Sequence, residues 1–114
     1  KSGQLAVLDA ASGQPVKVLE TGAGALAVTF STDGALAYVT NRGAGTVSLV
    51  DTRALTVLAS LQTGTHPNTV AVDRRTGLAY VSNKARSAPR PAQGQPPAPA
   101  PEDPNGDTVS LIRA

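Results

Sequence analysis

The chain has 114 residues and a formal net charge of +2, with no cysteine, methionine or tryptophan. The absence of cysteine excludes disulfides, thiolate metal sites and cysteine nucleophiles within these residues. The basic residues are scattered and lack interleaved aromatic residues, which argues against nucleic-acid binding. No apolar run approaches the ~20 residues that span a bilayer, and the sequence carries no signal peptide.

Short strands are predicted along nearly the whole chain, because Val-, Leu- and Ala-rich runs alternate with turn residues such as Asp33-Gly34 and Thr76-Gly77. None of these runs is long enough for a typical helix, and no sustained helical period is present. In chain order, the strands are expected at residues 5–9, 16–20, 25–31, 36–40, 47–51, 57–62, 68–73, 78–82 and 108–112.

These predicted strands belong to an internal repeat. AYVTN ends at Asn41 and AYVSN ends at Asn83, 42 residues later. A third copy begins where residues 46–49, TVSL, return as residues 108–111, 62 residues later, so this repeat carries 20 extra residues. The surplus coincides with residues 85–106, which hold seven of the nine prolines.

Four short strands in 42 residues form the unit of a β-propeller blade. A β-sandwich or a β-solenoid is the alternative, but a sandwich needs no sequence repeat of this length and a solenoid coil is usually shorter. The predicted fold class is therefore all-β, with propeller blades of four antiparallel strands. The chain would hold about two blades plus one strand of a larger propeller of about seven blades.

The segment from Tyr38 to Asp51, YVTNRGAGTVSLVD, closely resembles the YVTN family of β-propeller repeats. The second copy, from Tyr80 to Asn83, differs by one Thr-to-Ser change. This resemblance covers nearly the whole chain except residues 85–106. It implies that residues 68–73 form an innermost strand beside the central channel, and that the chain starts and ends on third strands.

The resemblance also implies where the chain lies in the propeller. We expect residues 1–114 to be the C-terminal part, with Ala114 as a true C-terminus and the missing blades before Lys1. The partners expected on this basis are the remaining propeller blades, from the same polypeptide or from identical copies, together with another protein. Two blades alone would leave apolar faces bare, and such faces mark interaction surfaces or aggregation.

His66 is the sole histidine and the one candidate metal ligand. It precedes Pro67 in a loop that is expected to open onto one rim of the channel, where a histidine can bind a metal or haem or transfer a proton. The alternative is a plain turn residue, because the first repeat has Gly24 at the equivalent place. Arg42, Asn68 and Lys84 are predicted on the same rim, where cations could attract an anionic ligand or an acidic partner.

Other recurring polar residues are interpreted as structural. Asp9 and Asp51 recur after the third strand of their repeats and are expected to cap turns through the local backbone. Asn41 and Asn83 are assigned the same kind of role after the second strand. No GxSxG, HExxH, Walker or EF-hand motif is present, so no catalytic set is predicted.

Residues 85–106 are interpreted as a proline-rich insertion, extended or disordered, that emerges on the rim of His66. The function favoured by the whole pattern is a non-catalytic binding or scaffold propeller. The family resemblance places it in the bacterial periplasm or at the cell surface. The alternative is an enzyme or redox-associated propeller (lactonase-like, or associated with a quinoprotein or haem) with its active residues mostly in other blades. The sequence identifies no cofactor.

Overall fold

A computed structural model describes residues 3–85, 91–96 and 103–113. It contains β-strands and turns, and no helix able to cross a membrane is found among the described residues. The strands are β1 (Gln4–Leu8), β2 (Pro15–Glu20), β3 (Ala25–Phe30), β4 (Leu36–Asn41), β5 (Thr46–Asp51), β6 (Thr56–Gln62), β7 (Pro67–Val72), β8 (Leu78–Asn83) and β9 (Thr108–Arg113). Every strand predicted from the sequence is confirmed, with ends that differ by at most one residue.

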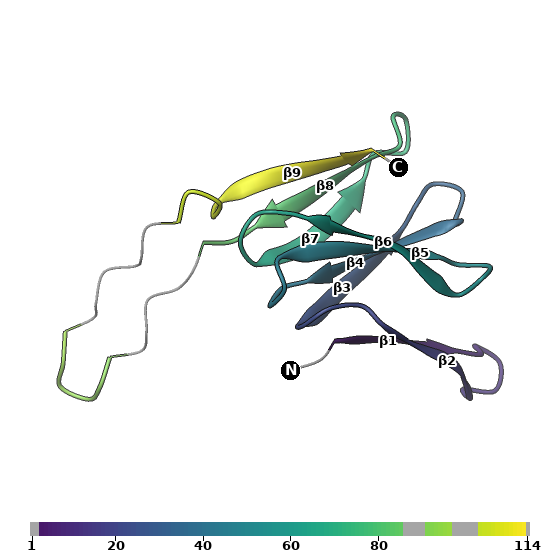
Figure 1. Ribbon diagram of the computed structural model, residues 1–114, viewed down its shortest axis with the longest axis horizontal. Coiled ribbons are helices and arrows are strands. Elements are labelled where there is room, and N and C mark those ends of the chain that lie inside the picture. Colours follow the sequence, from purple (N-terminus) through teal and green to yellow (C-terminus); the bar gives the residue numbers. More distant parts are fainter. Residues whose placement is uncertain (1–2, 86–90, 97–102, 114) are drawn as a thin grey trace.

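The strands form three antiparallel sheets in which neighbours along the chain pair with each other. The first sheet is β1–β2, the middle sheet is β3–β4–β5–β6, and the last sheet is β7–β8–β9. Figure 1 shows the three sheets stacked as successive layers, with the first sheet below the middle one and the last above it. The predicted all-β fold, with one complete four-stranded blade between two partial ones, is therefore confirmed.

The same pairing register recurs in the middle and last sheets. Tyr38 lies opposite Leu49 and Asn41 lies opposite Thr46, while Tyr80 lies opposite Leu111 and Asn83 opposite Thr108. A one-residue slip would turn each strand's apolar side chains to the other face. The shared register thus explains why the repeat survives the longer connection before β9.

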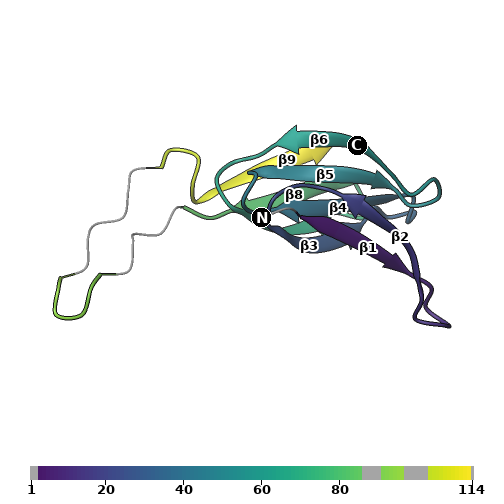
Figure 2. The same ribbon diagram turned by 60° about the horizontal axis from the view of Figure 1, so that its bottom comes forward.

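The two central strands of the middle sheet, β4 and β5, contribute to a buried apolar cluster on each face. Tyr38 and Val47 on one face pack against Ala79, Val81 and Ile112 of the last sheet. The opposite face packs against the first sheet in a second cluster, formed by Leu19, Ala37, Val39 and Val50 with Leu5 and Ala25 at its edge. Adjacent residues of β4 thus serve opposite faces, because side chains alternate along a strand. Figure 2 shows the layers from a second direction.

The hydroxyl residue of each YVTN copy, Thr40 or Ser82, makes defined hydrogen bonds. The Thr40 hydroxyl donates to the backbone oxygen of Asn68 in the last sheet, at 3.2 Å, and accepts the N–H of Ala27 at 3.1 Å. The equivalent Ser82 hydroxyl lies 2.9 Å from the Thr69 hydroxyl and accepts the Thr69 N–H at 3.4 Å. A hydroxyl is what both positions share, which explains why Ser replaces Thr in the second copy.

The two asparagines correct one sequence-based interpretation. Asn41 is fully buried, and its Nδ2 donates to Ser48 Oγ at 2.9 Å and to Thr46 Oγ1 at 3.2 Å. Asn83 makes the same pair of bonds to Ser110 and Thr108. These side chains therefore tie the second strand to the third, instead of bonding to the local backbone as the sequence led us to expect. Because the amide is buried, losing these partners would leave a desolvated polar group.

The stacking leaves apolar side chains uncovered at both ends. Tyr80 is 39% exposed although its equivalent, Tyr38, is fully buried. Val109 and Leu111 lie exposed on the same sheet, at places that match Val47 and Leu49 of the middle sheet. At the other end, β3 exposes three large side chains, Leu26, Val28 and Phe30. Both surfaces expose the kind of apolar side chains that are buried between the sheets elsewhere in the structure.

The predicted insertion at residues 85–106 lies partly outside the described residues, which omit 86–90 and 97–102. Within the described part, a turn is closed by a hydrogen bond from Gln95 N–H to the Ala92 oxygen at 2.9 Å. The segment's C-terminal end is anchored to the blades, since the Thr65 N–H donates to the Asn105 oxygen at 2.9 Å.

We expect Asn41→Ala to lower the free energy of unfolding by about 2 kcal/mol, because it removes a buried amide from two hydroxyl partners. Urea unfolding followed by circular dichroism would measure the change. Asn68→Ala is the matched control, since the Asn68 side chain makes no hydrogen bond to the described residues; its cost should stay within about 0.5 kcal/mol. Equal losses in the two variants would contradict the structural role of Asn41.

Candidate functional site

A polar crevice of about 230 Å³ lies between the middle and last sheets, at the end where β4 and β6 finish. One wall is the turn from β4 to β5, and the other is the connection from β6 to β7. Its lining residues are Arg42, Gly43, Ala44, Gly45, Gln62, Thr63, Gly64, Thr65, His66 and Asn105. The three glycines contribute no side chains, so backbone groups form much of the wall.

The backbone places His66 directly before the innermost strand of the last sheet. Its φ of 47° lies in the left-handed region, which costs energy for residues other than glycine. Gly24, 42 residues earlier, has a φ of 73° at the equivalent place. The backbone N–H of Lys84 donates to the His66 oxygen at 3.1 Å, just as the N–H of Arg42 donates to the Gly24 oxygen at 2.9 Å. The fold therefore needs the left-handed conformation here but does not need an imidazole.

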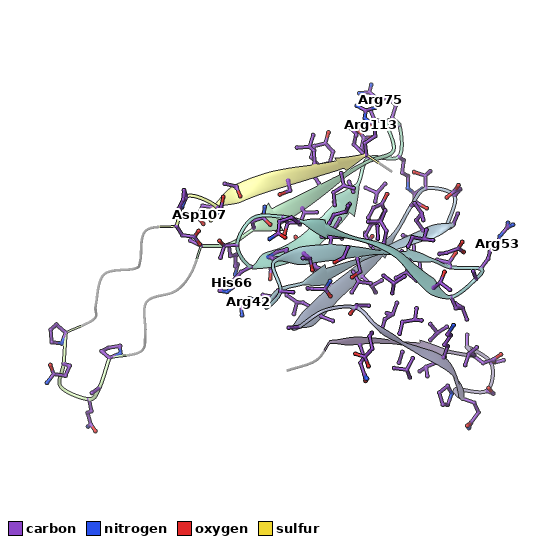
Figure 3. The ribbon with its side chains drawn as sticks, viewed as in Figure 1. Arg42, Arg53, His66, Arg75, Asp107 and Arg113 are labelled. Atoms are coloured by element: carbon purple, nitrogen blue, oxygen red, sulfur yellow. The ribbon has the colours of Figure 1, made fainter. Side chains whose placement is uncertain are left out.

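The imidazole of His66 is half-buried, and its Nδ1 is buried without a hydrogen-bond partner among the described residues. The Arg42 side chain is exposed and makes no ion pair within the described part of the chain. Figure 3 shows both side chains projecting together from the same end of the sheets. Within the residues that the structure describes, the crevice thus brings together a permanent positive charge without an ion pair and an imidazole without a side-chain hydrogen bond.

Thr65 closes one side of the crevice. Its hydroxyl donates to Asp103 Oδ1 at 2.8 Å, and its N–H donates to the Asn105 oxygen. Asp103 also accepts the Asn105 N–H at 3.2 Å, so this carboxylate is held at the edge of the crevice. The end of the insertion therefore lies on the same side of the molecule as His66, as the sequence predicted.

The four rim residues named from the sequence are only partly brought together. Arg42 and His66 line the crevice. Lys84 touches His66 through its backbone, and its side chain is exposed. Asn68 does not line the crevice, and its backbone oxygen faces Thr40. The sequence did not identify four other lining residues, Gln62, Thr63, Gly64 and Asn105. A signal for one wall was present, because Thr21-Gly22 recurs as Thr63-Gly64.

As a metal ligand, His66 stays a prediction. In the described part of the chain, no group of three or more His, Cys, Asp or Glu side chains could hold a metal ion. A structural zinc site has four protein ligands and a catalytic one has three. What the arrangement offers chemically is a guanidinium and an imidazole, which suit recognition of an anionic group.

The recurring aspartates are confirmed as turn caps. Asp51 Oδ1 accepts the N–H groups of Arg53 and Ala54, both at 2.9 Å. Asp9 Oδ1 accepts the N–H groups of Ala11 and Ser12 at 2.9 and 3.0 Å. The backbone N–H of Ser12, then that of Ala11, lowers the pKa of Asp9, and the N–H of Ala54, then that of Arg53, lowers the pKa of Asp51. They act on the backbone of the turns and not in the crevice.

Comparison with known proteins supports the fold. No protein-family model matches the chain. An uncharacterized protein YncE of Salmonella typhimurium is 33% identical over 96 residues, which are 84% of this chain and 27% of that protein. The protein of the same name in Salmonella typhi is 32% identical over the same proportions. The chain therefore spans only 27% of the length of these curated relatives.

Two solved structures share the arrangement of the sheets. Kuenenia stuttgartiensis hydrazine synthase matches 75% of this chain and 24% of that chain, with a TM-score of 0.68 and 21% identity. The dihydro-heme d1 dehydrogenase NirN, in complex with DHE, matches 70% of this chain and 17% of that chain, with a TM-score of 0.61 and 28% identity. Both neighbours are β-propeller proteins. The chain accordingly has the fold of part of a β-propeller.

The capped aspartates predict a loss of stability in acid. Their folded pKa values lie below the ordinary value of 3.8, so the ionised carboxylates stabilise the fold above pH ~4 and lose this effect as pH falls through the folded values. The double variant Asp9→Asn, Asp51→Asn should therefore lose less stability than the wild type between about pH 5 and pH 2. Denaturant midpoints measured across this range would show it, with Asp107→Asn as control. Parallel curves for the wild type and the double variant would contradict the caps.

Proposed function

We propose that this chain supplies YVTN-type blades to a larger, non-catalytic binding or scaffold propeller of the bacterial periplasm or cell surface. One observation carries the proposal: in the described residues, the recurring polar side chains bond within the fold. Asn41 and Thr40 join strands and blades, and Asp51 caps a turn. The crevice with Arg42 and His66 is left as a polar site whose side chains can meet a ligand.

The assignment to the YVTN family is supported by the role that each motif residue plays. Tyr38 packs on the next sheet and Val39 packs on the previous one. Thr40 bonds to the next sheet, and Asn41 ties the second strand of its own sheet to the third. The second copy, from Tyr80 to Asn83, repeats the register and the asparagine bonds. A motif whose every residue serves the stacking of blades defines a structural unit more than a chemical one.

The partners in this proposal are the remaining blades and, beyond them, another protein that binds the assembled surface. The remaining blades are supported as partners by the exposed face with Tyr80, Val109 and Leu111, because the equivalent face of the middle sheet is covered by the next sheet. The greater length of the relatives supports a source in the same polypeptide. Identical copies of the chain are the alternative source.

An enzyme or redox-associated propeller is the second candidate. It is favoured by the similarity to NirN, a dehydrogenase whose structure contains DHE, and by the histidine at the rim of the crevice. In that case the propeller would hold a redox cofactor, with most of the active residues in blades outside this chain. The periplasmic or surface location is common to both candidates, rests on the family resemblance, and would be tested by cell fractionation.

Absorbance and metal content of the purified intact protein distinguish the two candidates. The binding propeller predicts no absorbance in the visible range and no stoichiometric metal, because a non-catalytic binding protein needs no redox cofactor. A visible band or a stoichiometric metal that disappears in His66→Ala would establish the second candidate. The same spectrum in Lys17→Ala, an exposed residue on β2, controls for the effect of substitution.

A further inference from the structure

The crevice between the middle and last sheets differs in kind from the apolar groove beside β1. The groove beside β1 is lined mainly by apolar residues such as Leu5, Val28 and Phe30, and it lies where the second strand of the first blade would pack. The crevice is instead bounded by two described blades, and its lining is mostly polar. Its shape therefore does not depend on strands outside the described residues.

Two features of the crevice favour an anion. The Arg42 guanidinium is exposed and has no carboxylate partner within the described residues, and a planar guanidinium pairs with carboxylates through two parallel hydrogen bonds. His66 also lines the crevice with a half-buried imidazole, and its Nδ1 atom is buried without a partner in the described part of the chain. Both side chains face the same space.

The backbone conformation at His66 belongs to the fold, so the side chain is what distinguishes this place. The left-handed conformation costs more energy for a histidine than for a glycine, and the preceding repeat has Gly24 at this place. Leu55 and Asp107 also take positive φ values where other repeats have glycines, namely Gly13 and Gly45, so the conformation itself belongs to the fold. Of the three, only His66 brings a side chain with an unpartnered, buried nitrogen to a crevice.

The size and the charge of the crevice limit the class of ligand that it can bind. About 230 Å³ is below the range of roughly 300–1,000 Å³ that is usual for drug-sized ligands, so a small molecule or a terminal group fits. The planar guanidinium of Arg42 offers two parallel N–H donors, which the two oxygens of a carboxylate match. Of the two groups that this fork binds, a carboxylate is the smaller, which suits the small volume.

We propose that the crevice between the β4–β5 turn and the β6–β7 connection binds a carboxylate group, with Arg42 pairing with its oxygens and His66 hydrogen-bonding beside it. This inference rests on the proposed binding function and deepens it by naming the ligand class. The carboxylate comes either from a small organic acid or from an acidic side chain of a partner protein. Both sources present the same group to Arg42 and His66.

The test is a titration of the intact protein by NMR, which follows the imidazole signal that disappears in His66→Gly. The probes are succinate, a capped Asp-Glu dipeptide and inorganic phosphate. We expect saturable shifts with either carboxylate probe at dissociation constants on the order of 1 mM, and weaker binding of phosphate. The tighter of succinate and the dipeptide identifies the source as a small acid or a protein side chain.

Two variants and a matched control make the outcome specific. Arg42→Gln should weaken carboxylate binding about tenfold or more. His66→Gly should weaken it about three- to tenfold, as measured by calorimetry, while the fold stays intact because Gly24 occupies the equivalent place. Arg53→Gln removes the same charge at the opposite end of the sheets and should change the affinity less than about twofold.

Several results would overturn the proposal. These are the absence of carboxylate binding, tighter binding of phosphate than of either carboxylate, and equal weakening by Arg53→Gln and Arg42→Gln, which would indicate a general charge effect. Failure here is distinguishable from failure of the proposed function. A bound cofactor would overturn the non-catalytic function without affecting the titration, and a missing carboxylate site would leave partner binding by other surfaces intact.

Discussion

The structure depends on the contact between one face of a sheet and the opposite face of the next. Tyr38 and Val47 are fully buried because Ala79 and Val81 of the following sheet lie against them. Burying apolar surface is the dominant favourable term in folding. The chain has only three aromatic residues, so small aliphatic side chains must supply most of that surface. A sheet in this chain therefore gains its core from its neighbours and not from itself.

Hydrogen bonds set the register on which this contact relies. The amide of Asn41 connects the second strand to two hydroxyls of the third, and the Thr40 hydroxyl reaches the backbone of the next blade. Because these groups are buried, a shifted register would leave them without partners, at a cost comparable to a large fraction of a domain's stability. Apolar stacking and polar bonding thus select the same arrangement, as expected of a sequence that specifies one fold.

Most of the fold could be predicted from the sequence because each sequence repeat corresponds to one set of four strands. A period of 42 residues with four strand signals left few architectures, and the longer spacing before β9 located the insertion. The asparagine bonds were missed, since an Asn next to a turn is compatible with local bonding as well. The signal was present, because Thr46 and Ser48 return as Thr108 and Ser110 beside the second asparagine.

The site was harder to predict than the fold. The sequence placed Arg42 and His66 on one rim, but it could not show that Asn68 turns away from the crevice or that Asn105 reaches it across the insertion. Such details depend on side-chain direction and on contacts between distant segments, which periodicity does not encode. The positive φ of His66 was also hidden, although its alignment with Gly24 is consistent with it.

We propose that a further blade covers the face of the last sheet that carries Tyr80. Light scattering of this chain at increasing concentration, together with circular dichroism, tests it most directly. The account predicts a β-rich species whose mass exceeds that of one chain and falls toward the monomer in Tyr80→Asp, because a charge on that face opposes its burial. A stably folded wild-type monomer at every concentration, with Tyr80 still exposed, would contradict the claim.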